Sequence, residues 1–210
     1  MSLLIAEEIL NNELQLLESE HPGNFKMSEV KTSLLKSIYE IAKGEEIRTI
    51  VDNNYMTYDE VISNVHMKIG GELLAISMLI PFLISGNNFK DALFKIGMSL
   101  QLLDDIVDLE EDIESNTQNA FLSYLLDNSI AIQDITNYNN RNKDIQTHYH
   151  NLIYSAVQIG LDGFKDFEKN GLEIGYKDGE KLMEFMFINR KMQDEWKIYK
   201  KMKKEKGDIQ

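Results

Sequence analysis

The chain alternates between long stretches in which apolar residues recur every three or four positions and short polar breaks. This spacing places the apolar side chains on one face of a helix, so each stretch predicts an amphipathic helix. The predicted helices cover residues 3–20, 28–52, 57–85, 88–114, 119–127, 144–167 and 179–206. Residues 128–143 are rich in Asn and Asp and are expected to connect two of them. The pattern therefore predicts an all-α helical bundle of six or seven helices.

Local signals mark where the third of these helices begins and how it packs. Thr57 and Glu60 have the spacing of a capping box, in which each side chain hydrogen-bonds the other residue's backbone N–H. Gly70 and Gly71 lie in the middle of the helix, where they permit a bend or the close approach of another backbone. Pro81 is expected to kink or end the last turns, because proline cannot continue a regular helix.

Composition limits the domain organisation and the functions open to the chain. Its 210 residues, two prolines and twelve glycines predict a single domain, residues 1–210, built from long regular elements. The net charge of −13 argues against nucleic acid as a partner, because phosphate binding needs a basic surface. The absence of cysteine is compatible with the cytoplasmic location that we expect. We expect no signal peptide and no transmembrane segment, because the most apolar run, residues 73–85, is shorter than the ~20 residues that a span needs.

Residues 97–112 carry the most informative chemical pattern. On a continuous helix, Gln101 and four aspartates would fall within an arc of about 100°. These aspartates are Asp104, Asp105, Asp108 and Asp112. A row of like charges destabilises a helix, which indicates that a cation belongs there. Oxygen ligands without His or Cys suit Mg²⁺, which often completes its coordination shell with substrate phosphates.

A solvated acidic face is the alternative interpretation of this stripe, and two features argue against it. Gly97 and Gln101 extend the stripe with a small residue and a neutral amide, where a surface face would carry Lys or Arg. No basic residue lies three or four positions from Asp104, Asp105 or Asp108, so their charge has to be compensated from outside the helix.

The pattern Gly-x-x-x-Gln-x-x-Asp-Asp-x-x-Asp over residues 97–108 resembles the second aspartate-rich motif of the trans-isoprenyl diphosphate synthases. Lys68 resembles the lysine of that family's Lys-Thr segment, although Ile69 replaces the threonine. Gly44-Glu45 stands where the family carries a Gly-Gln pair. The order of these features agrees with the family over roughly residues 28–127.

The resemblance implies an isoprenoid-synthase-type bundle that binds Mg²⁺, prenyl diphosphate and isopentenyl diphosphate, usually as a homodimer. It implies that Asp104, Asp105 and Asp108 are catalytic and line a central cavity, and that Asp104 and Asp108, with Asp112, bind the metal. Lys68 and Gln101 would contact the diphosphate. In the intact enzyme, loss of diphosphate would yield an allylic cation for head-to-tail prenyl transfer. Prenylation of a peptide and cyclisation of the prenyl chain use the same metal chemistry and stay open.

One expected feature of the family has no counterpart near the beginning of the chain. Residues 1–43 contain no aspartate, whereas the family places its first aspartate-rich motif before the Gly-Gln pair. We therefore expect the C-terminal part of a synthase domain, which would be inactive by itself because one side of the diphosphate lacks charge neutralisation. A non-catalytic subunit and a helical protein-interaction module are the alternatives.

The last predicted helix, residues 179–206, is rich in lysine. A solvated amphipathic end is the interpretation that we favour. A basic tail that closes over a bound diphosphate and a segment attracted to a membrane surface are the alternatives.

Overall fold

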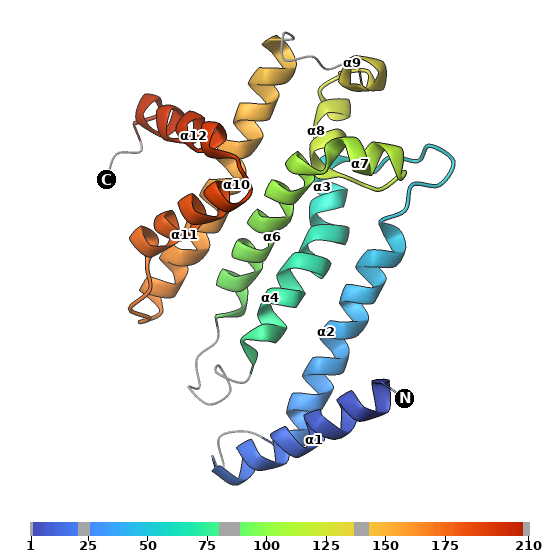
Figure 1. Cartoon of the computed structure of the whole chain (residues 1–210), viewed down its shortest axis with the longest axis vertical. Coiled ribbons are helices and arrows are strands. Elements are labelled where there is room, and N and C mark those ends of the chain that lie inside the picture. Colours follow the sequence, from blue (N-terminus) through green and yellow to red (C-terminus); the bar gives the residue numbers. More distant parts are fainter. Residues whose placement is uncertain (1, 21–25, 80–88, 137–142, 208–210) are drawn as a thin grey trace.

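A computed structural model describes residues 2–20, 26–79, 89–136 and 143–207, and the side chains of residues 2–10 are left out. Figure 1 shows a helical bundle, which confirms the predicted all-α fold class. The elements are α1 (Ser2–Glu20), α2 (Met27–Ile47), α3 (Tyr58–Val61), the π-helix η1 (Ile62–Gly71), α4 (Glu72–Ser77), α6 (Lys90–Val107), α7 (Leu109–Glu114), α8 (Ala120–Asp127), α9 (Ile132–Thr136), α10 (Lys143–Lys169), α11 (Tyr176–Asn189) and α12 (Gln193–Glu205). Within these described ranges, no helix is both long and apolar enough to cross a membrane.

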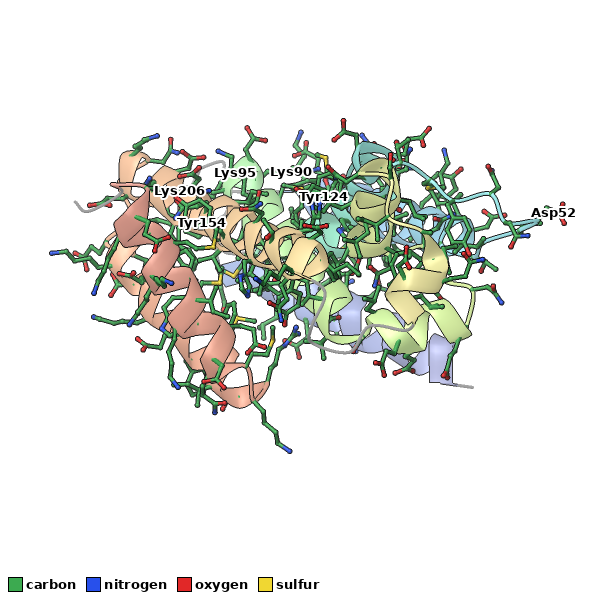
Figure 2. The ribbon with its side chains drawn as sticks, turned by 90° about the horizontal axis from the view of Figure 1, so that it is seen from above. Asp52, Lys90, Lys95, Tyr124, Tyr154 and Lys206 are labelled. Atoms are coloured by element: carbon green, nitrogen blue, oxygen red, sulfur yellow. The ribbon has the colours of Figure 1, made fainter. Side chains whose placement is uncertain are left out.

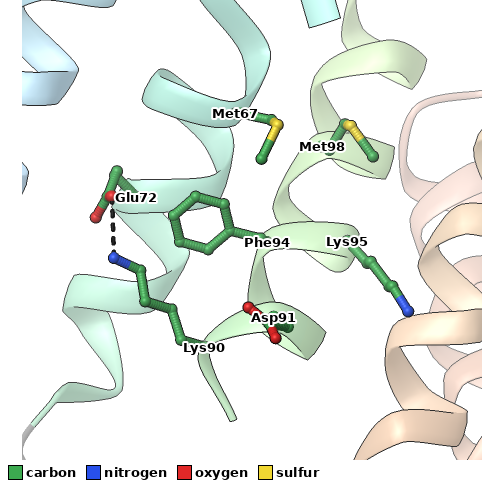
Figure 3. Close-up of a pocket in the computed structure, with 7 residues that line it drawn as sticks. All are labelled: Met67, Glu72, Lys90, Asp91, Phe94, Lys95 and Met98. Atoms are coloured by element: carbon green, nitrogen blue, oxygen red, sulfur yellow. Dashed lines mark hydrogen bonds and ion pairs between the residues drawn. The ribbon is translucent and has the colours of Figure 1, made fainter. Parts of the chain in front are cut away.

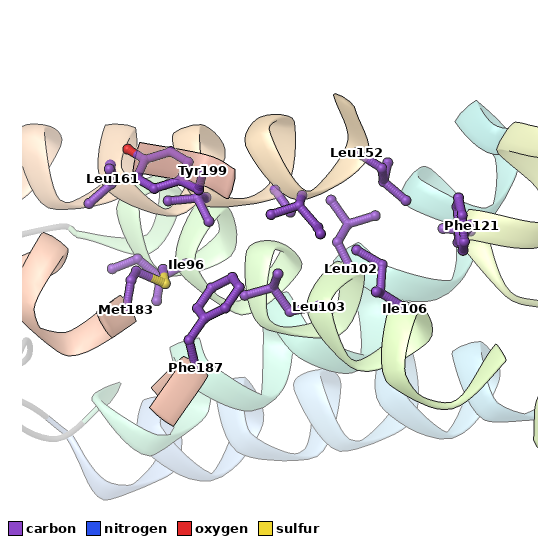
Figure 4. Close-up of a cluster of buried hydrophobic side chains, with 14 of the residues drawn as sticks. Ile96, Leu102, Leu103, Ile106, Phe121, Leu152, Leu161, Met183, Phe187 and Tyr199 are labelled. Atoms are coloured by element: carbon purple, nitrogen blue, oxygen red, sulfur yellow. The ribbon is translucent and has the colours of Figure 1, made fainter. Parts of the chain in front are cut away.

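Helix α6 lies at the centre of the bundle, with α10 on one side and η1 and α4 on the other (Figure 1). Its apolar residues Leu102, Leu103 and Ile106 are buried. Figure 4 shows them next to side chains of α10 and α11, among them Leu152 and Phe187. Burial of these side chains orients α6, and α6 carries most of the predicted site residues.

Two glycines let the backbones of η1 and α6 touch where the helices cross. A Cβ atom placed on Gly97 would lie 2.2 Å from the Gly70 carbonyl oxygen. A Cβ atom on Gly70 would lie 2.6 Å from the Gly97 carbonyl oxygen. Neither contact leaves room for a side chain, because a backbone atom cannot move aside as the end of a flexible side chain can. The predicted close approach at Gly70 is confirmed, with Gly97 as its partner.

The third predicted helix begins as expected but changes its winding. The Thr57 backbone N–H donates to Glu60 at 2.9 Å and the Glu60 N–H donates to Thr57 at 3.4 Å, which confirms the capping box. From Ile62 onward the helix has π winding over ten residues. Val65, His66 and Ile69 are buried in this π-helix. Over only ten residues, the apolar spacing of a π-helix is difficult to distinguish from that of an α-helix. Pro81 lies outside the described residues.

Two predicted helix boundaries are wrong, and the backbone shows the reason in each case. The second predicted helix ends at Ile47 rather than near residue 52, because Ile50 N–H donates to the Asn116 carbonyl and Gln118 N–H donates to the Arg48 carbonyl. The last predicted helix is two helices, α11 and α12. Lys191 between them has a φ of 60°, a left-handed conformation that stops an α-helix.

Helix α12 packs on α10 and α11, and two of its lysines pair with acids of α11. Lys200 lies 3.2 Å from Glu184, and Lys203 lies 3.0 Å from Glu180, both acids being on α11. Lys206 lies over the Tyr154 ring at the opposite end of the molecule from Asp52 (Figure 2). These contacts support the interpretation of α12 as a solvated amphipathic end rather than a free basic tail.

Candidate functional site

The predicted aspartate helix is interrupted in the middle of its acidic stripe. Helix α6 ends at Val107, Asp108 has φ −94° and ψ 9°, and α7 begins at Leu109. The expectation that all four aspartates share one stripe is therefore wrong. Asp104 and Asp108 are partly exposed, whereas Asp105 and Asp112 are buried.

Asp104 and Asp108 form the accessible half of the acidic motif. The Asp104 side chain is 42% exposed. Its Oδ1 atom forms an ion pair with Nη1 of Arg190, 2.8 Å away, at the end of α11. Burial raises the pKa of Asp108, and the nearby Asp104 and Glu111 charges raise it further. The negative charge of Asp104 thus makes ionisation of Asp108 less favourable. Arg190 supplies the compensation from outside the helix that the sequence pattern requires, and its position could not be read from local spacing.

Asp105 is held at a meeting point of three helices. One of its carboxylate oxygens accepts a hydrogen bond from His66 Nε2 of η1 at 2.9 Å. The same oxygen accepts a short hydrogen bond from the Ala120 N–H at the beginning of α8. The exposed fraction of the Asp105 residue is 2%, so these partners replace water around its carboxylate. Sequence reasoning missed His66, because no His, Asp or Glu lies three or four positions from it.

Asp112 belongs to the same buried network. Asn119 Nδ2 donates to the Asp112 carboxylate at 2.8 Å and to the Asp105 backbone carbonyl at 2.8 Å. Arg48 lies 3.7 Å from the other Asp112 oxygen, at a polar pocket of about 310 Å³ that Thr117 also lines. These partners satisfy Asp112 within the protein, so it is less suited to bind a metal ion than the partly exposed Asp104 and Asp108.

The predicted diphosphate contacts Lys68 and Gln101 lie near the helix crossing. Lys68 Nζ is 4.0 Å from Glu40 of α2, a distance that makes the ion pair weak. Gln101 packs its Cγ against Gly70 and is partly exposed. Lys68 faces α2 through its contact with Gly44, whereas Asp104 reaches toward α11. Lys68 therefore pairs with Glu40 rather than with the carboxylates of the acidic motif.

A second, apolar pocket of about 390 Å³ runs along α6 and was not predicted. Met67, Phe94 and Met98 line it, and Phe94 lies between the two methionines and the charged mouth (Figure 3). At the mouth, Lys90 pairs with Glu72 at 3.1 Å. Lys95, which also lines the pocket, pairs with Asp166 of α10, so both lysines of the pocket are already in ion pairs.

The pKa of Asp112 leads to a testable pH dependence. Burial is the main cause that raises this pKa above its ordinary value of 3.8, so the folded chain holds the proton more tightly than the unfolded chain. The resulting stabilisation is present below pH 3.8 and is lost as the pH rises through the raised pKa. Asp112→Asn removes this titration and keeps an oxygen for Asn119.

We expect the free energy of unfolding of Asp112→Asn, relative to wild type, to improve as the pH rises above 3.8. Urea unfolding at a series of pH values measures it. A difference that does not change with pH would show that the pKa of Asp112 is the same in the folded and unfolded chains.

Among the described residues, His, Asp and Glu side chains form no cluster of three that could hold a metal ion by itself. A cation at the exposed pair would thus need further oxygen ligands from water or from a bound substrate.

Comparison of the chain with protein-family models, with curated proteins and with solved structures finds no match.

Proposed function

We propose that this protein binds a Mg²⁺–prenyl diphosphate complex at Asp104, Asp108 and Arg190, and that it takes part in prenyl transfer of the isoprenoid-synthase type. The observation that carries the proposal is the accessible pair of carboxylates one turn apart, with a guanidinium 2.8 Å from one of them. An anionic ligand with its cation needs both kinds of group. Carboxylates bind the metal, and arginine is well suited to phosphate oxygens.

The ligand set fits Mg²⁺ rather than a metal held only by the protein. Mg²⁺ commonly uses one or two carboxylates and completes its octahedron with water and substrate phosphates. When bound, it would neutralise the leaving diphosphate and so favour cleavage of the bond to the allylic carbon. Arg190 would donate hydrogen bonds to the same diphosphate, and Gln101, which is partly exposed on α6, remains a proposed polar contact.

Not every predicted site residue has the same support in this proposal. Asp105 is the least suited to touch substrate, because its carboxylate is occupied by His66 and Ala120. Lys68 could reach a diphosphate only by leaving Glu40. Transfer to isopentenyl diphosphate and a homodimeric assembly remain part of the proposal on the strength of the sequence resemblance.

A helical interaction module is the second candidate function, and exposed apolar residues on α2 favour it. Leu35 is 67% exposed and Tyr39 is 64% exposed, with Ile38 beside them. They lie at spacings of three and four, so they form one apolar stripe on the outside of the helix. The binding experiment below separates the candidates, because a pure interaction module has no reason to bind diphosphate.

We expect Mg²⁺ with inorganic diphosphate to raise the melting temperature of the wild-type chain. A ligand at one hundred times its Kd stabilises a protein by about 2.7 kcal/mol. For a chain of this size that corresponds to a rise on the order of 5–10 °C. The double variant Asp104→Ala/Asp108→Ala should lose the rise, because it removes both proposed metal ligands. Differential scanning fluorimetry with Mg²⁺ alone, diphosphate alone and both together measures the effect.

A matched control is available on the neighbouring helix. Glu110→Ala/Glu114→Ala removes two exposed carboxylates with the same spacing of four, and it should keep the rise. An equal rise in Asp104→Ala/Asp108→Ala would mean that the motif is only a solvated face. No rise in the wild-type chain would favour the interaction module.

A further inference from the structure

We propose that His66 is a positioning residue for the Mg²⁺–diphosphate site, which it supports through Asp105 without touching the ligand; this inference rests on the proposed function. His66 is contributed by η1, far from α6 in the sequence. Its Nε2 atom lies 2.9 Å from the carboxylate of Asp105, the residue next to the proposed ligand Asp104.

The contact restrains the rotation of α6 about its own axis, in addition to the buried apolar side chains that orient the helix. One carboxylate oxygen of Asp105 contacts both His66 of η1 and the Ala120 N–H at the beginning of α8. Residue 104 follows from residue 105 by the geometry of α6, so its direction is set once residue 105 is held. The anchored carboxylate thus determines that Asp104 reaches Arg190 on α11.

The same network stabilises the break that orients Asp108. In a continuous helix, the Asp105 carbonyl would accept a hydrogen bond from the N–H of residue 109. Here it accepts one from Asn119 Nδ2, and Asn119 also binds Asp112 on the far side of the break. The side chain of Asn119 therefore connects the residues before and after the break. His66 contacts the carboxylate of Asp105, the residue before the break to which Asn119 donates.

The chemistry of His66 is difficult to explain by packing alone. Only 1% of the residue is exposed, and its second ring nitrogen, Nδ1, has no hydrogen-bond partner among the described residues. An apolar residue would fill the same space without a buried polar atom left unpaired. His66 also lies in a π-helix, a winding that is found frequently at functional sites. The retained imidazole is accounted for by its bond to Asp105.

The test compares ligand affinity with stability in three variants. His66→Leu fills the site but cannot donate to Asp105, and His66→Gln retains a donor. Val65→Ala is the control, because Val65 is the buried neighbour on η1 and makes no contact of this kind. We expect His66→Leu to weaken the Kd for Mg²⁺–diphosphate about tenfold, as loss of a group that orients a metal ligand does. Gln should restore most of the affinity, and Val65→Ala should lower the melting temperature with its Kd unchanged.

Isothermal titration calorimetry measures the Kd at a temperature well below the melting temperature of every variant. Should His66→Leu fail to fold, Asn119→Ser is the second variant, because serine can still cap α8 but is too short to bridge the break. It too should weaken the affinity. Binding by His66→Leu or Asn119→Ser equal to wild type would overturn the positioning role and leave the proposed function intact. A wild-type chain that binds no Mg²⁺–diphosphate would instead refute the proposed function itself.

Discussion

Gly97→Ala is expected to destabilise the protein by about 3 kcal/mol, the upper end of the cost of overpacking. Alanine would favour an α-helix over glycine by about 1 kcal/mol in the absence of any contact. Its methyl group would nevertheless lie 2.2 Å from the Gly70 carbonyl oxygen and 2.6 Å from the Gly70 carbonyl carbon. Helices η1 and α6 would have to separate, and that separation would disturb every contact between them, including the His66–Asp105 bond.

Equilibrium unfolding in urea gives the free energy for this variant and for a control in the same helix. Ser99→Ala lies two residues further along α6, and the Ser99 hydroxyl is buried without a hydrogen-bond partner among the described residues. Its removal should therefore change stability little or increase it. If Gly97→Ala is as stable as wild type, the two helices do not touch at their backbones.

The helices could be predicted because each buries one apolar face, and an apolar face requires apolar residues to recur every three or four positions along the sequence. Thr57 and Asn119 also follow from local chemistry, since a side-chain oxygen at a helix start satisfies a free N–H. The π winding of η1 depends on what packs against Val65 and His66, so it could not be predicted from the neighbouring residues in the sequence. The turn at Lys191 is similar, because lysine adopts a left-handed conformation only where the surrounding structure requires it.

The site could be predicted in its elements but not in its partners. The pattern correctly indicates that the charge of the aspartates has to be compensated from outside their helix. It could not show that Arg190, 86 positions after Asp104, provides this compensation, because helix packing brings them together. Nor could it separate Asp105 from Asp104. Adjacent residues point about 100° apart on a helix, so one can be buried while the other is exposed.

Asp105→Ala is expected to cost about 3–5 kcal/mol, as the removal of one partner from a buried ion pair or hydrogen-bonded pair does. The change leaves His66 Nε2 and the Ala120 N–H without their shared acceptor, in a place where water does not reach them. A globular domain is stable by only about 5–15 kcal/mol, so the loss would be a large part of the total. Urea unfolding followed by far-UV circular dichroism measures it.

Two further variants show whether the buried network is the cause. Asp105→Asn keeps one oxygen that can accept from His66 and Ala120, so it should lose clearly less stability than Asp105→Ala. Asp104→Ala removes the adjacent carboxylate, whose ion pair with Arg190 is partly exposed, and should cost less than about 1 kcal/mol. The expected order of stability is therefore Asp104→Ala, then Asp105→Asn, then Asp105→Ala. Equal losses in the two alanine variants would mean that Asp105 is as accessible as Asp104, and the inference about His66 would then lose its structural basis.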